Sequence, residues 1–464
     1  MSASPLSLLI LAAAAIAGLT AWSAYFPAAP ATRAPAPPDE ISLPPAVTPR
    51  TALPDAMALL EIIPPSSPDS KTDLLLQERQ ILTARHPTRA ELWVQLGDAL
   101  AQKQRETQLP VWHDRAEAAY QKAQQIEPAT VAALNGLAWV YGSRHDFQES
   151  VRWAKLALDL DPANPISHGI MGDAALELGD LERAAESYQA MLDARPDMSS
   201  YSRAAYLVWM KGDVKKGRWL MQKAIDAGSP HPENVAWCRT RLAMMLFNEG
   251  ALLPAGQVVA EGLKQTPDHV PLLLLLGKIK LAQRDEKAAT AAFESVLKSG
   301  ENHDALVGLG DLHLIHGRTD LAESFFTRLE KQHRLNAAQG IHDHTQMARF
   351  YADHDRELDR ALQFAQEHAQ TQNVYEADTL AWVCYQKGDL KLARKAIETA
   401  LRAGTPDAEI FYHAGLIAAA LNDRPGAQKL LSRALSLNPH FHPLHSTKAL
   451  KKLDELARTL TVKN

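Results

Sequence analysis

Histidines are the residues best suited to chemistry in this sequence, and they gather at two places. One cluster reads HFHPLH at residues 440–445, and the other reads HDH at residues 342–344. Imidazole nitrogens bind divalent metals such as zinc. Neither cluster has an evident third or fourth ligand at the usual spacing, so we interpret both as histidine-rich polar turns. The sequence therefore predicts no metal site.

Signatures of catalysis are missing from the sequence. It contains no glycine-rich phosphate loop, no GxSxG, no HExxH and no CxxC. Its two cysteines, Cys238 and Cys384, are distant in sequence, whereas a disulfide needs Cα atoms within about 7 Å. We therefore predict a protein that is not an enzyme, with no catalytic residues and no cofactor. An enzymatic or metal-binding protein is the least favoured alternative.

The composition is that of a folded soluble chain. Apolar residues make up 46% of the 464 positions and charged residues 22%. The formal net charge is −5, whereas a nucleic-acid-binding protein normally presents a basic face. We therefore expect no nucleic-acid partner.

The first 26 residues carry a targeting signal with two main interpretations. Leu6–Phe26 contains no charged residue, and about 20 apolar residues suffice to cross a bilayer. Trp22 and Tyr25 at its end suit a membrane interface. A cleaved secretory signal is the alternative, although no Lys or Arg precedes the apolar run; a cytoplasmic location is the third. We expect a single-pass inner-membrane anchor with a periplasmic folded part, or a periplasmic protein after cleavage.

A proline-rich linker follows, over residues 27–68. Prolines interleaved with Ala and Thr cannot build a core, so we expect a disordered spacer with extended polyproline segments. Residues 53–63 could form a short amphipathic helix inside it. The next segment, residues 69–89, predicts one amphipathic helix over Asp69–His86, which Pro87 ends.

Elements that repeat about every 34 residues account for most of the remaining chain. When Val374–Pro439 is shifted by 34 residues, Ala381 aligns with Gly415 and Gly388 with Asn422. Self-similarity at this period indicates stacked helix pairs, and the small residues mark close helix approach. Units begin near Ala90, Val131, Pro165, Met198, Ala236, Val270, His303, Ile341, Val374 and Ala408. Three longer spacings, of 41, 38 and 38 residues, predict loop extensions.

The motif within each unit resembles a known family. Trp93, Leu96 and Gly97, followed by Ala116 and Tyr120, match the W-x2-L-G…A-x3-Y/F pattern of the tetratricopeptide repeat. The chain resembles exported bacterial members without a catalytic domain, since the repeats leave no room for one. The resemblance implies an all-α, right-handed α-solenoid of about ten helix pairs over residues 90–440. A polar capping helix is expected in residues 441–464.

The resemblance also implies a binding groove lined by the first helix of each pair. Family positions two, five, nine and twelve place ten residues there as partner-binding candidates: Trp139, Tyr206, Trp209, Trp237, Met244, Phe247, Tyr375, Trp382, Tyr385 and Tyr412. Fewer charged residues fall on this face: Asp98, Asp173, Lys278, Asp311, Arg349 and Asp378. Aromatic side chains dominate binding hot spots. The alternative is that part of the set packs between helices, as we expect for Trp93, Trp153 and Trp219.

These patterns favour a protein-interaction scaffold that holds a protein or peptide in the groove, with a membrane contact only through the N-terminal segment. The alternative is an assembly factor for an envelope or cytochrome c-type complex, which would have one defined client.

Overall fold

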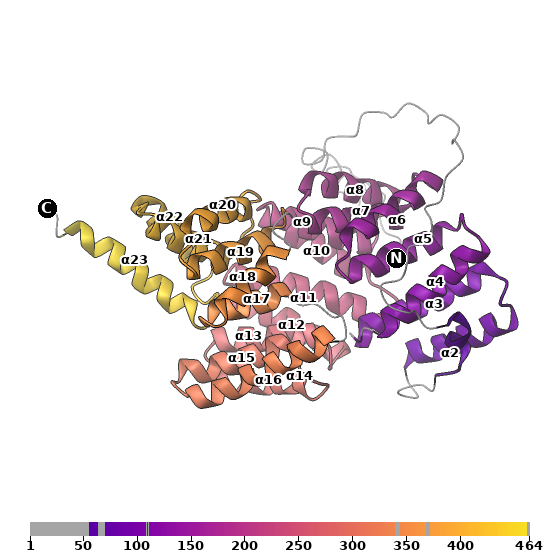
Figure 1. Ribbon diagram of the computed structural model, residues 1–464, viewed down its shortest axis with the longest axis horizontal. Helices are drawn as coiled ribbons and strands as arrows, with labels where there is room; N and C mark the ends of the chain where they lie inside the picture. The colour runs from indigo at the N-terminus through magenta and orange to yellow at the C-terminus, as the bar shows by residue number, and fades with distance from the viewer. Residues whose placement is uncertain are drawn as a thin grey trace, which may run out of the picture. The chain divides into compact units, whose positions relative to one another are not determined.

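The structure is a computed structural model that describes residues 55–63, 70–107, 109, 111–338, 344–367 and 372–461. Its regular elements there are helices, packed side by side in consecutive pairs (Figure 1). The predicted all-α solenoid is confirmed. No helix of this described part is both long and apolar enough to cross a membrane. The predicted anchor, residues 1–26, lies outside the described residues.

The chain divides into two compact units, the first comprising residues 1–175 and 181–195. Within the first unit, a short 3-10 helix and a single α-helix precede three helix pairs. The elements are η1 (Ala56–Leu60), α2 (Lys71–Arg85), α3 (Ala90–Thr107), α4 (Val111–Ile126), α5 (Val131–Ser143), α6 (Phe147–Leu160), α7 (Pro165–Glu177) and α8 (Leu181–Ala194). Leu59 of η1 is buried, and the Gln80 amide donates to its carbonyl over 2.8 Å. Residues 55–63, assigned above to the linker, are therefore packed onto the repeats.

The second unit comprises residues 176–180 and 196–464. It contains seven helix pairs and a final single helix among the described residues. These are α9 (Met198–Met210), α10 (Val214–Ala227), α11 (Pro232–Asn248), α12 (Leu252–Gln265), α13 (Val270–Ala282), α14 (Glu286–Leu297), α15 (His303–Ile315), α16 (Thr319–Ala338), α17 (His344–Asp353), α18 (Leu358–Glu367), α19 (Val374–Gln386), α20 (Leu390–Leu401), α21 (Ala408–Ala420), α22 (Arg424–Leu437) and α23 (His445–Thr461).

The three long spacings lie in longer helices, so the prediction of loop extensions is wrong. Helices α3, α11 and α16 have 18, 17 and 20 residues, whereas α5 and α13 have 13 each. Gln, Arg, Glu, Leu and Ala in these segments are good helix formers, so continuing the helix costs less than opening a loop. Pro232 takes the first turn of α11, where its missing N–H is harmless.

A repeated turn joins the two helices of most pairs. A residue with positive φ, such as Gly388 (81°) or Asn422 (63°), precedes an aspartate that caps the second helix. Asp389 and Asp423 each accept a backbone N–H from the first turn of α20 and α22. Glycine or asparagine tolerates the left-handed backbone, and aspartate satisfies an otherwise unpaired donor. This turn explains why Gly388 and Asn422 align in sequence.

Aromatic side chains of the second helices fill the space between pairs. Phe293 of α14 is fully buried, and its ring lies against the backbone of Gly277 in α13 and Gly308 in α15. A Cβ at either glycine would come closer than 3.0 Å to ring atoms of Phe293. Tyr120 occupies the same place in the first unit, between Gly97 and Gly136. The small residues of the motif are therefore required by close packing.

In the second unit the solenoid closes on itself. The Asn373 side chain, before α19, donates to the carbonyl of Glu177 over 3.3 Å. The Thr405 hydroxyl donates to the Met210 carbonyl over 2.9 Å across 195 residues of sequence. The Asn438 amide donates to the Phe247 carbonyl over 2.8 Å across 191 residues. Solenoid repeats ordinarily contact only their neighbours, so these contacts mark a completed superhelical turn.

Candidate functional site

The ten candidate groove residues differ in exposure. Four are packed inside the repeats: Trp209, Phe247, Trp382 and Tyr412, with 0, 8, 2 and 1% of their surface exposed. The other six are half-buried: Trp139, Tyr206, Trp237, Met244, Tyr375 and Tyr385. A partner can touch only the second group directly. Trp219, expected to be packed, is instead 50% exposed on α10, so that prediction is wrong.

Three of the half-buried residues come together around Arg241, and we call Tyr206, Trp237, Arg241 and Tyr375 the aromatic patch. The Arg241 guanidinium carbon lies 4.7 Å from the Tyr206 ring centroid and 4.9 Å from that of Trp237. Burial, and then the neighbouring Tyr206, raise the pKa of Tyr375 well above its ordinary value. The patch thus offers neutral hydroxyls, aromatic faces and one cation from α9, α11 and α19.

Trp139 belongs to the first unit, whereas the residues of the aromatic patch belong to the second. Its ring packs against the apolar core of the first unit, which draws residues from η1 to α7. The Arg105 guanidinium carbon is 5.5 Å from the ring centroid, and the His113 ring is 5.8 Å away. These contacts account for its half-buried state without a partner.

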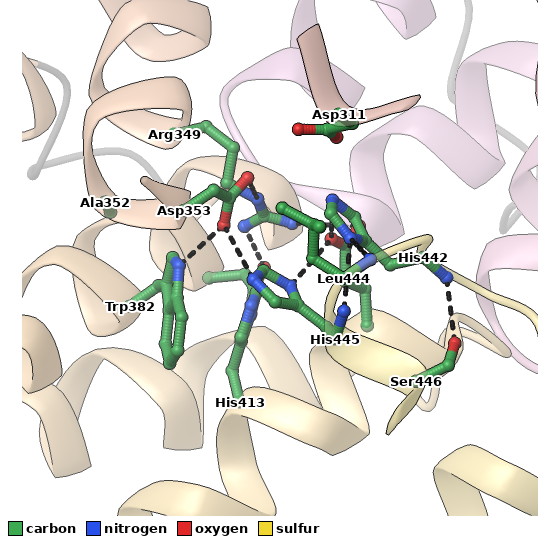
Figure 2. Close-up of polar contacts among 12 residues, drawn as sticks. Asp311, Arg349, Ala352, Asp353, Trp382, His413, His442, Leu444, His445 and Ser446 are labelled. Atoms are coloured by element: carbon green, nitrogen blue, oxygen red, sulfur yellow. Dashed lines mark hydrogen bonds and ion pairs between the residues drawn. The ribbon is translucent and has the colours of Figure 1, made fainter. Parts of the chain in front are cut away.

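The C-terminal aromatics surround a buried polar cluster instead of a groove. Trp382 stacks on Tyr385 at 5.2 Å and on His413 at 4.3 Å, and Tyr412 stacks on His445 at 5.1 Å. We call the polar residues among them the acid–histidine cluster: Arg349 and Asp353 of α17, Asp378 of α19, Glu409 and His413 of α21, His442 just before α23, and His445 at its first residue. Figure 2 labels Arg349, Asp353, His413, His442 and His445 of this cluster. The cluster occupies the place where α23 meets the last repeats.

Arg349 is the hub of the acidic groups in the cluster. Its guanidinium lies 2.5 Å from Asp378 and 3.4 Å from Glu409. Burial alone would raise the pKa of Asp378, but His413 and Arg349 outweigh it and hold that pKa below its ordinary value. Burial is likewise outweighed at Glu409, chiefly by Arg349, so its pKa is well below the usual one. Both carboxylates are therefore ionised at neutral pH.

The two histidines at the start of α23 are neutral at the same pH. Burial, together with the neighbouring His445, lowers the pKa of His442 to about 4. Burial also lowers the pKa of His445 to about 4, although Glu409 opposes that shift. A buried site that combines ionised carboxylates with neutral imidazoles is unusual for packing alone.

The sequence identified only part of this cluster. Arg349 and Asp378 were assigned to the groove face, and His442 and His445 to a polar turn. Asp353, Glu409 and His413 were missed because nothing local distinguishes them from surface residues. The available signal was register: Asp378 and His413 stand one repeat apart on consecutive first helices. Of the second histidine group, His344 pairs with Glu367, while residues 342 and 343 lie outside the described part.

The consecutive packed helix pairs define a class of protein, the helical-hairpin solenoid. A family model described as "Tetratricopeptide repeat" matches residues 171–232, 274–337 and 379–441. The chain therefore contains tetratricopeptide repeats over these residues.

Solved structures with similar folds are distant in sequence. Human IFIT1 is 15% identical, with a TM-score of 0.42, over 82% of this chain and 93% of that one. Yeast Tom70 is 11% identical, with a TM-score of 0.35, over 84% and 96%. PilW, titled a type IV pilus biogenesis factor, is 15% identical, with a TM-score of 0.39, over 44% and 93%. Such likenesses carry no functional argument.

Proposed function

We propose that this protein is an interaction scaffold whose aromatic patch binds an extended segment of a partner protein. The carrying observation is the position of Arg241 between the half-buried rings of Tyr206 and Trp237. Tyr, Trp and Arg are the residues that most often dominate protein interfaces. An aromatic face beside a cation suits a peptide that carries apolar and acidic side chains.

We also propose that the scaffold is tethered. Leu6–Phe26 would anchor it to the inner membrane with the repeats in the periplasm, or would direct it there and be cleaved. The length and lack of charge of this segment support the proposal. Mass determination of the mature protein distinguishes the two forms, because cleavage removes more than twenty residues.

Site-specific photocrosslinking tests the binding surface. A photoreactive phenylalanine analogue replaces Trp237 in cells that natively make the protein, and the matched control carries it at Trp219. Both positions are tryptophans, but Trp219 is exposed on a second helix and lies outside the patch. We expect a discrete adduct from position 237 that is absent from position 219. Equal adducts at both positions, or none at 237, would reject the patch.

The identity of the crosslinked protein also distinguishes a general scaffold from an assembly factor. One recurrent client that belongs to an envelope or cytochrome c-type complex would support the assembly factor. Several unrelated adducts would support a general scaffold. Substituting Arg241 by Ala should abolish either pattern while leaving the helical circular dichroism intact, since Arg241 is half-buried.

A further inference from the structure

Three ring nitrogens in the acid–histidine cluster are buried without a hydrogen-bond partner among the described residues: Nε2 of His413, and both Nδ1 and Nε2 of His445. Both side chains are 0% exposed. An unpaired buried polar atom is costly and calls for an explanation. We propose that Asp353, His413 and His445 form a binding site for one divalent transition-metal ion of the zinc type.

The three ligand atoms converge from three separate elements. Asp353 ends α17, His413 lies in α21 and His445 begins α23. Their ligand atoms lie within 4.8 Å of one another, and the Nε2 of His445 is 3.9 Å from the Asp353 carboxylate. Zinc–ligand bonds of 2.0–2.2 Å place tetrahedral ligands about 3.3 Å apart. Side-chain movements of about 1.5 Å or less therefore complete the site.

His413 is already oriented as a metal ligand. Its Nδ1 lies 3.0 and 3.1 Å from the two oxygens of Asp378, so Nδ1 carries the proton and Nε2 presents its lone pair. A carboxylate behind a ligating histidine is the usual support of metal-bound imidazole. The Trp382 ring stacks on His413, and its indole N–H donates to the Asp353 carboxylate over 2.7 Å. Two of the three ligands thus have outer partners (Figure 2).

A second grouping, Glu409, His442 and His445, also gathers three ligand atoms, but its hydrogen bonds argue against it. The Nδ1 of His442 accepts the backbone N–H of Leu444 over 3.1 Å. A neutral imidazole whose Nδ1 accepts must carry its proton on Nε2, the atom that would have to bind the ion. In the favoured grouping, the Nδ1 of His445 does not bind the ion and lies 3.9 Å from the Glu409 carboxylate.

Charge gives an independent argument. Asp353, Asp378 and Glu409 surround a single guanidinium, that of Arg349, at 2.5–3.9 Å. The formal charges of these three carboxylates and one guanidinium sum to −2. The side chains of Asp378 and Asp353 are only 0 and 9% exposed, so water compensates little of it. A divalent cation neutralises the cluster, and imidazole ligands favour zinc-like ions over magnesium.

The ion would act as a clamp on the end of the solenoid. It would join the first residue of α23 to α17 and α21, which lie in separate repeats. The sequence predicted no metal site because, of the three proposed ligands, only His445 belongs to the histidine group at 440–445. The remaining ligands come from residues about 30 and 90 positions earlier.

Calorimetric titration of the full-length, chelator-stripped chain with zinc chloride tests the proposal. We expect one saturable equivalent per chain and no competition by magnesium. His413→Gln and His445→Gln should each weaken zinc binding at least about 100-fold. His442→Asn keeps an oxygen that can accept the N–H groups at the start of α23, and should leave affinity unchanged. The exposed His440→Gln is the surface control.

Several results would overturn the site. They are the absence of saturable zinc binding, full binding in His413→Gln, or loss in His442→Asn with retention in His413→Gln, which would assign the other grouping. Titration of the wild-type protein with cobalt tests the site without relying on variants, whose loss of binding could come from misfolding. A visible ligand-field band that saturates at one equivalent and is displaced by zinc supports the site. A wild-type titration without such a band overturns it.

Discussion

The side-chain amide of Asn438 donates a hydrogen bond to the backbone carbonyl of Phe247 over 2.8 Å, although 191 residues separate them. Asn438 is fully buried, and its amide oxygen also accepts the backbone N–H of His440 over 2.8 Å. With the contacts at Asn373 and Thr405, it closes the superhelical turn of the second unit.

Asn438→Ala should destabilise the protein by about 1–3 kcal/mol, because it leaves a buried carbonyl without its donor. Thr405→Val, which removes the donor to the Met210 carbonyl, should behave alike. Urea unfolding followed by circular dichroism measures the loss. The matched control is Thr399→Val, whose hydroxyl bonds locally: it donates to the Lys395 carbonyl and accepts from the Arg402 guanidinium. If the contact at Thr405 stabilises the closed turn, Thr405→Val will lose more unfolding free energy than Thr399→Val. Equal losses would refute this role.

Gly308→Ala should also destabilise, against the usual trend for helices. Alanine in place of a mid-helix glycine ordinarily gains roughly 0.5–1 kcal/mol. At Gly308 the new methyl would approach the Phe293 ring closer than 3.0 Å, and overpacking costs about 1–3 kcal/mol. Gly256→Ala is the control, because its nearest neighbour, Ile279, is 3.9 Å away. Opposite signs of the two unfolding free-energy changes are expected; a gain at both positions would contradict the packing argument.

Local features of this fold are predictable from sequence, and its closure is not. The 34-residue register places α5, α7, α9 and α21 at their first residue, because capping and small-residue packing are local requirements. The number of pairs per superhelical turn depends on small rotations that accumulate along the stack. Sequence motifs do not encode that sum, so the contact between Asn438 and Phe247 was not foreseen.

The same dependence on long-range packing explains which candidate groove residues the sequence misplaced. Family positions selected Tyr206 and Trp237, which are half-buried, but also Trp209 and Phe247, which are buried; a partner-binding role for the first two stays a prediction. They misjudged Trp382 and Tyr412, which face α23 and the histidines there. A rule derived from open repeats assumes solvent beside the first helices. Here Phe441 and His445, where the chain enters α23, pack against Trp382 and Tyr412, so these aromatics surround a polar cluster.

Acid should destabilise the first unit through His113. Its pKa is lowered to about 4 from an ordinary 6.5, first by burial and then by Arg144 and His145. The unfolded chain takes up a proton as the pH falls from 6.5 to 4, whereas the folded chain does not. Stability that is complete above pH 6.5 is therefore lost through this window, by about 1.4 kcal/mol per pH unit for one proton.

His113→Gln should remove this component. Between pH 7 and pH 5 the variant should lose about 2 kcal/mol less unfolding free energy than the wild type. Urea unfolding at the two pH values measures the difference. His86→Gln, at an exposed position in the same unit, is the control and should follow the wild type. Parallel pH profiles for wild type and His113→Gln would show that burial of this imidazole is not coupled to folding.

Trp382→Phe isolates the orienting role of one outer hydrogen bond at the proposed metal site. The substitution keeps an aromatic ring beside His413 but removes the indole N–H that donates to Asp353 over 2.7 Å. Outer-partner losses of this kind typically lower metal affinity 10–100-fold, so zinc titration should show a shift of about that size with unchanged helical content. Trp219→Phe, exposed on α10, should leave the affinity at the wild-type value. If Trp382→Phe binds zinc as tightly as wild type while His413→Gln does not, then Asp353 is held by the ion itself and the indole has no orienting role.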